Sequence, residues 1–177
     1  MLHGRNFAAV LHAARMGDDW AWKALYDELA PGLLGYLRAR RAARPEELLG
    51  EVMLQIVRDL PSFGGGNWDL RVWAFTIAHN RLRDEEARGA AKPTEPIRFP
   101  ATAHTDPLWA SSVERVGRLL ALLDPGEQNV ILLRILGELT CEEVGTVIGE
   151  EVDTVDALQL QGLETLRSEL AKEVAAI

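Results

Sequence analysis

With 177 residues, of which 47% are hydrophobic and 26% charged, the chain is long enough for one or two globular domains with a buried core. Its single cysteine, Cys141, excludes an internal disulfide framework, and no apolar run is long enough to cross a bilayer. Residues 1–10 lack the apolar core and cleavage site of a signal peptide, so we expect a cytoplasmic protein without membrane insertion.

The formal net charge of -8 is distributed unevenly along the chain. Residues 1–92 carry 13 Lys and Arg against 12 Asp and Glu, a balance of +1. Residues 113–177 carry 5 against 13, a balance of -8. The acidity therefore belongs to the second half, which disfavours phosphate binding there.

Apolar residues recur with helical spacing and β-branched alternation is scarce, so the sequence predicts an all-α fold. Pro61 and the glycines 64–66 separate two of the expected helices, and four prolines at 93, 96, 100 and 107 prevent a helix from continuing. We therefore predict two helical domains, residues 1–92 and 113–177, joined by a Pro-rich linker over 93–112. The expected N-terminal helices are 7–16, 20–29, 33–41, 45–60 and 72–88.

In the second half, helices are expected over 111–123 and after the Asp124-Pro125 pair, followed by a helix-turn-helix. Thr140 and Glu143 form a capping box, and Gly149 ends the first of these two helices. The second helix begins near residues 152–154. Its groove-facing side is expected to present Asp153, Thr154, Asp156, Gln159 and Gln161, where a DNA reader needs Lys and Arg.

The helix over 73–84 places apolar side chains inward and is expected to project His79, Asn80, Arg81 and Arg83 beside the Gly-rich loop. Aromatic rings that stack on bases, together with amide and guanidinium donors, are what an opened duplex needs. Two alternatives to nucleic-acid binding remain open: that Trp73 packs in the core, and that the arginines belong to an ordinary solvated surface.

Four stretches of the sequence resemble bacterial RNA polymerase sigma factors of the extracytoplasmic-function (ECF) group, in the order of that family and over nearly the whole chain. The third is the most specific. They are AARMGDDWAWKALYDELAPGLLGYLR (13–38), PEELLGEVMLQ (45–55), WAFTIAHNRLRD (73–84) and LDPGEQNVILLRILGELTCEEVGTVIG (123–149).

The resemblance implies that residues 1–92 correspond to sigma region 2, which captures the melted minus-ten promoter element, with the loop over 63–71 receiving a flipped base. The residues that it implies for DNA binding are Phe63, Asn67, Trp68, Arg71, Trp73, His79, Asn80, Arg81 and Arg83. The residues that it implies for docking on core polymerase are Glu46, Glu47, Leu48, Leu49 and Glu51, with Gly50 standing where the family usually has Gln.

The resemblance also implies that residues 113–177 are a region 4 helix-turn-helix, for which Thr140, Glu143, Thr154, Asp156 and Gln159 are the candidate contacts with the upstream promoter element. Family members usually carry basic residues where this chain has Asp156, Leu158 and Gln161, and Asp153 adds a second acid, so the sequence predicts weak DNA recognition by this domain.

Two hypotheses of function follow. In the first, the chain is a sigma factor that binds core RNA polymerase and promoter DNA. In the second, it is a sigma-derived regulator whose C-terminal domain binds a protein, either an anti-sigma factor or an activator. The four histidines and Cys141 have no ligand spacing, and no nucleotide-binding or nucleophile motif is present, so we expect no metal, no cofactor and no enzymatic activity.

Overall fold

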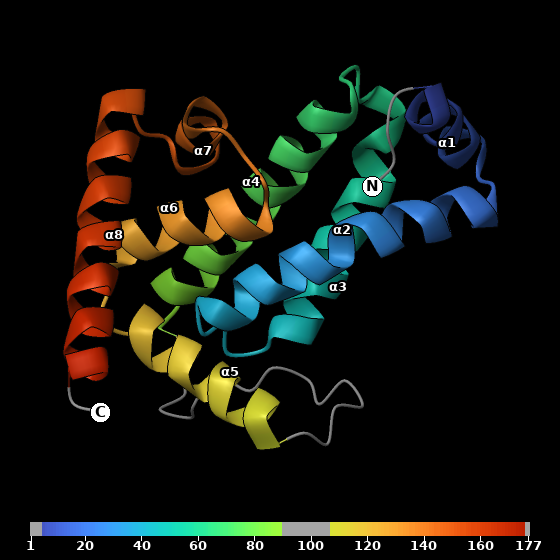
Figure 1. The fold of residues 1–177 in the computed structure, drawn as a ribbon. Coiled ribbons are helices and arrows are strands. Elements are labelled where there is room, and N and C mark those ends of the chain that lie inside the picture. Colours follow the sequence, from blue (N-terminus) through green and yellow to red (C-terminus); the bar gives the residue numbers. More distant parts are fainter. Residues whose placement is uncertain (1–4, 90–106, 176–177) are drawn as a thin grey trace.

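The computed structural model describes residues 5–89 and 107–175, and within these ranges the chain is helical with no strand (Figure 1). The predicted all-α fold is confirmed. The chain order is α1 (Arg5–Met16), α2 (Asp19–Ala39), α3 (Pro45–Asp59), a short 3-10 turn (Leu60–Ser62), α4 (Asn67–Ala87), α5 (Pro107–Leu120), α6 (Pro125–Leu136), α7 (Cys141–Ile148) and α8 (Val152–Ala175). None of the described helices is both long and apolar enough to span a membrane.

Helix α2 is the centre of the N-terminal bundle and packs against α1, α3 and α4. Tyr36 of α2 meets Phe75 of α4 edge to face, with ring centroids 5.9 Å apart. The prediction of two helices in this region is wrong, because Pro31 lies inside one continuous helix. Leu29 and Leu33, on either side of Pro31, are both buried, and this packing outweighs the hydrogen bond that proline cannot make.

Helix α4 begins at Asn67, five residues before the predicted start at 72. The carboxylate of Asp69 accepts a 2.6 Å hydrogen bond from the Gly66 N–H, which ties the Gly-rich loop to the first turn. A Cβ at Gly65 would lie 2.5 Å from the Cβ of Asp69, so this close approach requires glycine.

The caps of the C-terminal helices agree with the sequence. Glu143 donates its N–H to the Thr140 hydroxyl (3.2 Å), and the Thr140 N–H donates to the Glu143 carboxylate (2.7 Å). Gly149 ends α7 in the left-handed region at φ +76°. Helix α5 begins at Pro107, inside the segment predicted as linker, while residues 93–106 of that segment lie outside the described residues.

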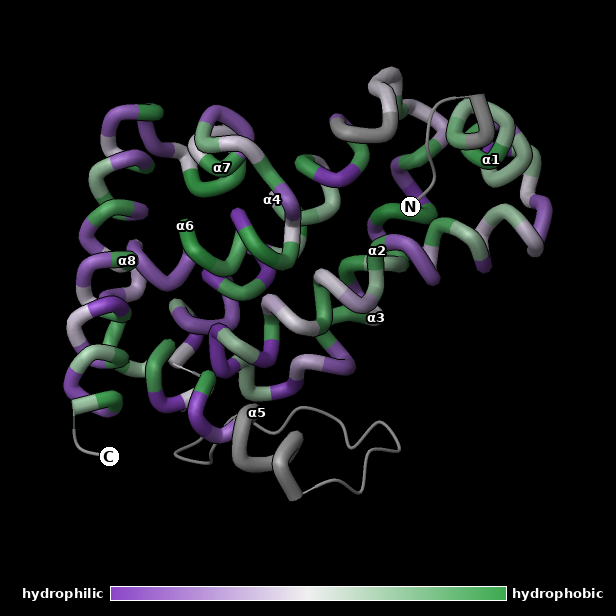
Figure 2. The backbone as a smooth tube through the Cα atoms, in the orientation of Figure 1, coloured by the Kyte–Doolittle hydropathy of each residue, from purple (hydrophilic) through white to green (hydrophobic). Residues whose placement is uncertain are grey.

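The two halves of the chain pack against each other: α6 contacts α2, and α7 contacts α4 (Figure 1). The tube coloured by hydropathy shows a largely hydrophobic α6 between α8 and the N-terminal helices, whereas hydrophobic and hydrophilic residues alternate along α8 (Figure 2). A Cβ at Gly32 would lie only 2.8 Å from the Leu136 carbonyl oxygen. The closeness of α2 to the end of α6 therefore depends on a residue without a side chain.

Candidate nucleic-acid interface

An aromatic stack lies where the Gly-rich loop meets α4. The rings of Phe63 and Trp73 are 5.0 Å apart and inclined by 20°, and both side chains are half-buried. Trp73 is thus partly a packing residue and partly accessible. Asn67 and Trp68 form the first residues of α4, and their side chains lie outside the described part of the structure.

Further along α4, Asn80 and Arg83 are exposed, as predicted. Arg81 is half-buried and donates from its Nη2 and Nε atoms to the Gln55 side-chain oxygen at 2.9 and 3.3 Å. Its guanidinium also lies 3.8 Å from the Glu51 carboxylate. Arg81 therefore joins α4 to α3, while Asn80 and Arg83 leave their polar groups available to a ligand.

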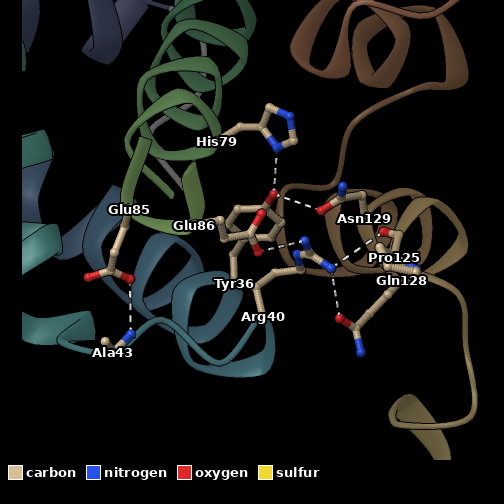
Figure 3. Close-up of polar contacts among 9 residues, drawn as sticks. All are labelled: Tyr36, Arg40, Ala43, His79, Glu85, Glu86, Pro125, Gln128 and Asn129. Carbon is tan, nitrogen blue, oxygen red and sulfur yellow. Dashed lines mark hydrogen bonds and ion pairs between the residues drawn. The ribbon is translucent and has the colours of Figure 1, made fainter. Parts of the chain in front are cut away.

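The expectation that His79 projects from the surface is wrong. Its side chain is 4% exposed, and its Nδ1 lies 2.8 Å from the Tyr36 hydroxyl (Figure 3). The Tyr36 hydroxyl has one hydrogen, which it donates to Asn129 Oδ1 in a 3.0 Å hydrogen bond. The hydrogen between Tyr36 and His79 therefore belongs to His79 Nδ1, which donates to the hydroxyl oxygen. Burial, and then the positive charges of Arg40 and Arg83, lower the pKa of His79 to about 4, and the ring is neutral at pH 7.

Arg40 makes further polar contacts between the two halves of the chain, and the sequence analysis did not identify it. It is nearly buried, forms a 3.2 Å ion pair with Glu86, and donates to the Gln128 side-chain oxygen at 2.9 Å and the Pro125 carbonyl at 3.4 Å (Figure 3). Burial also raises the pKa of Tyr36. No spacing rule predicts this network, because its members come from three helices far apart in the sequence.

Arg71, a predicted DNA contact, is occupied by internal partners. Its guanidinium lies 2.6 Å from the Glu28 carboxylate, 3.7 Å from that of Glu138, and donates to the Gly137 carbonyl at 3.4 Å. Two of these three partners come from the connection between α6 and α7. In this arrangement Arg71 connects the halves, and only 11% of its side chain is exposed to a ligand.

The predicted polymerase-docking residues on α3 divide into two groups. Glu46 and Glu47 are exposed and paired with Arg38 and Arg44, each at 2.5 Å, and the hydrogen bond from Arg38 lowers the pKa of Glu46. Glu51 is also exposed. The leucines of this set, Leu48 and Leu49, are core residues here rather than surface residues, because the apolar side of α3 faces the bundle.

Two apolar residues of α3, Leu54 and Val57, are exposed instead, and the sequence analysis missed them. They stand on the outer side of α3. Their positions follow from the helical spacing once the buried set is known, but the sequence alone did not identify which side faces the bundle.

The helix-turn-helix presents an acidic surface. Thr154 and Asp156 are exposed, whereas Gln159 accepts a 2.9 Å hydrogen bond from Arg134 Nε. Arg134 also donates to the Leu139 carbonyl, so this basic group beside α8 serves the domain itself. The Cys141 thiol donates to the Gln159 side-chain oxygen at 3.6 Å, and the nearby Asp156 carboxylate raises the pKa of this thiol.

Known proteins that are similar to this chain are sigma factors. The relatives include SigD of Mycobacterium tuberculosis, 25% identical over 96% of this chain and 86% of the relative, and RpoE of Cereibacter sphaeroides, 24% identical over 94% and 96%. ShbA of Streptomyces griseus is 26% identical over 90% of this chain and 93% of its own length. Each is named an ECF RNA polymerase sigma factor. The relatives of this chain are ECF sigma factors.

The fold agrees with the same group. The structure of CnrH in complex with the cytosolic domain of CnrY superposes with a TM-score of 0.68 over 94% of this chain and 97% of CnrH, at 19% identity. No family model matches the sequence. Because ECF sigma factors are transcription regulators, the prediction that this chain is not an enzyme agrees with its relatives.

In residues 5–89 and 107–175, no three His, Cys, Asp or Glu side chains are grouped to hold a metal ion. What the structure brings together is an aromatic stack, an exposed amide and an exposed guanidinium on one helix, with Arg71 and His79 turned to the contact between the halves.

Proposed function

We propose that this protein is a sigma factor of the ECF type, which brings core RNA polymerase to promoters and opens the minus-ten element with its N-terminal domain. The observation that carries the proposal is the exposure of Asn80 and Arg83, about two and three turns along α4 from the Phe63–Trp73 stack, on a chain whose ECF relatives match it over nearly its whole length. It acts where polymerase and promoter DNA are, in the cytoplasm.

In this proposal, Asn80 and Arg83 contact an unpaired base or phosphate of the melted strand. The segment over 63–71, made of the Gly-rich loop and the first turn of α4, receives a flipped base, and the partly accessible Trp73 adds an aromatic surface. Unstacking one base costs a few kcal/mol, which a polar pocket with a stacking ring offsets. The exposed carboxylates of α3, together with Leu54 and Val57, form the surface that meets core polymerase.

In this proposal, the conformation with the two halves packed together is that of the protein without polymerase. The halves separate when the protein binds promoter DNA. Arg71 supports this step, because its guanidinium reaches DNA only after leaving Gly137 and Glu138. The domains that separate are residues 1–92 and 113–177, with 93–112 as the linker. An anti-sigma factor that holds the halves together would keep the protein inactive.

The test is transcription in vitro with purified core polymerase on a promoter library. Asn80→Ala and Arg83→Ala should each reduce open-complex formation by about 1 to 3 kcal/mol, or roughly 5- to 150-fold, if each contact reaches a base or phosphate. The matched control is Arg118→Ala, an exposed arginine on α5. Normal promoter opening by both folded α4 variants would remove this assignment.

A second function is favoured by one observation, the acidic surface of α8. The exposed Asp153 and Asp156 would repel DNA phosphates, so we infer that the C-terminal domain binds a protein instead of the upstream promoter element. The full-length protein should then show no salt-dependent affinity for that element. The pair Asp156→Lys and Gln161→Arg should create it, whereas Ser168→Lys, further along α8, should not; tight salt-sensitive binding by the natural protein would contradict the idea.

A further inference from the structure

Helix α8 carries an exposed apolar stripe that no described part of the chain covers. Its buried side, with Val155 and Gly162, packs on α6 and α7, and α5 contacts it near its end. Helix α8 lies at the edge of the molecule (Figure 1), and the flank next to its buried side is exposed. Leu160 and Leu163 are 61% and 49% exposed, and the stripe also includes Val152, Leu170 and Val174.

The residues of this flank follow the spacing of a coiled-coil seam. Positions 156, 160, 163, 167, 170 and 174 alternate steps of four and three, the pattern that keeps one side of a helix against a partner helix. Four of these positions are Leu or Val. The two polar positions, Asp156 and Arg167, carry opposite charges.

The order of the charges selects the orientation of the partner. If a second α8 runs antiparallel, with residue 160 opposite residue 163, then residue 156 stands opposite residue 167. Each Asp156 thus meets an Arg167, and each Leu160 meets a Leu163. A parallel arrangement would place Asp156 against Asp156 and Arg167 against Arg167, which is repulsive.

Within the described residues, Arg167 is exposed and has no ion pair or hydrogen bond of its own. The exposed Ile135 of α6 flanks the seam, and an open groove of about 460 Å³ between α6 and α8 is lined by Ile131, Ile135 and Leu163 among others. A partner helix on the seam would cover this groove as well. In this register the contact would extend over residues 152–171 of each α8, roughly 30 Å, with Leu170 opposite Asp153 and Val174 outside the contact.

We propose that α8 pairs antiparallel with α8 of a second copy of this chain, forming a two-fold dimer. Leu160 and Leu163 form its centre, and the Asp156 and Arg167 pairs fix its register. The dimer covers the exposed part of the helix-turn-helix, so it excludes any other ligand of that surface. The inference does not depend on the sigma-factor role, since it rests on the seam alone.

Sedimentation of the full-length protein at low salt, over a concentration series up to about 100 µM, measures this association. The natural protein should sediment as a concentration-dependent dimer, and Leu160→Glu should be monomeric. The control is Leu122→Glu, a leucine 51% exposed outside α8, which should still dimerise. A monomeric natural protein, or a dimer that survives Leu160→Glu, would overturn the proposal.

A charge exchange tests the orientation. Asp156→Arg and Arg167→Asp should each weaken the dimer about tenfold, because each single change places like charges together at two symmetric positions. The double variant, Asp156→Arg with Arg167→Asp, should restore the natural association. Absence of this rescue in folded variants would exclude the antiparallel register. Transcription by the monomeric Leu160→Glu variant tests the proposed function separately.

Discussion

The Tyr36 hydroxyl is the point at which three helices share hydrogen bonds. It accepts a hydrogen bond from His79 of α4 and donates one to Asn129 of α6, so each half of the chain supplies a partner. A buried polar group of this kind stabilises the structure only while every member keeps its partner. Burial and the charges of Arg40 and Arg83 favour the neutral form of His79 in the folded protein, so protonation of this ring opposes the folded structure.

Stability should fall as pH decreases from about 6.5 towards 4. The folded pKa of His79, about 4, lies below the ordinary value of 6.5, so in this window the unfolded chain binds more protons than the folded one. Between pH 7 and pH 5, the melting temperature of the natural protein should fall more than that of His79→Gln, which keeps a donor for Tyr36. His12→Gln, an exposed histidine on α1, is the control; equal losses in all three would contradict this role.

Among the helices, α3 contains the clearest opportunity for a gain in stability. Gly50 is exposed in the middle of this helix, and a Cβ there would meet nothing within 4 Å. Gly50→Ala should raise the free energy of unfolding by about 0.5 to 1 kcal/mol, measured by chemical denaturation. Gly50→Gln should give a similar gain and, by adding an amide to the proposed docking surface, tighten binding to core polymerase.

The control for this effect is Gly65→Ala, where the new Cβ would lie 2.5 Å from that of Asp69 and should destabilise the loop. An unchanged or lowered stability of Gly50→Ala would show that α3 does not hold the helical conformation described here. Polymerase affinity unchanged by Gly50→Gln would show that position 50 lies outside the part of α3 that contacts polymerase.

Local chemistry explains why some element boundaries were predictable. Thr140, Glu143 and Gly149 make their caps within one or two turns, so the sequence was sufficient for α7. Pro31 could not be interpreted in the same way, because the buried residues that hold α2 continuous across it belong to tertiary packing. The site followed the same division: Asn80 and Arg83 were placed correctly, whereas the burial of His79 depends on Tyr36, a distant residue.

At the scale of the whole molecule, the contact between α2 and α6 can be opened by one added side chain. Gly32→Val would place its Cβ 2.8 Å from the Leu136 carbonyl, a backbone atom that cannot rotate away. The halves should separate, and the radius of gyration in solution scattering should increase with helix content unchanged. Gly35→Ala, whose Cβ would meet only the flexible end of the Leu136 side chain at 3.3 Å, should remain compact.

A Gly32→Val variant as compact as the natural protein would show that the interface adapts around the new side chain. Loss of helix content would instead mean that the halves do not fold independently, against the proposed domain boundaries at 92 and 113.

The network of Arg40, Tyr36 and Arg71 joins two parts of one chain, so its strength does not vary with protein concentration. A ligand that binds only the open form has an apparent affinity equal to its intrinsic affinity multiplied by the fraction of molecules that are open. Once one such ligand has bound, a second no longer meets that penalty, and linkage makes the benefit reciprocal. Binding of core polymerase would thus raise the affinity of this protein for promoter DNA, and binding of DNA would raise its affinity for polymerase. This cooperativity would need no contact between polymerase and DNA, because it would arise from the closed packing.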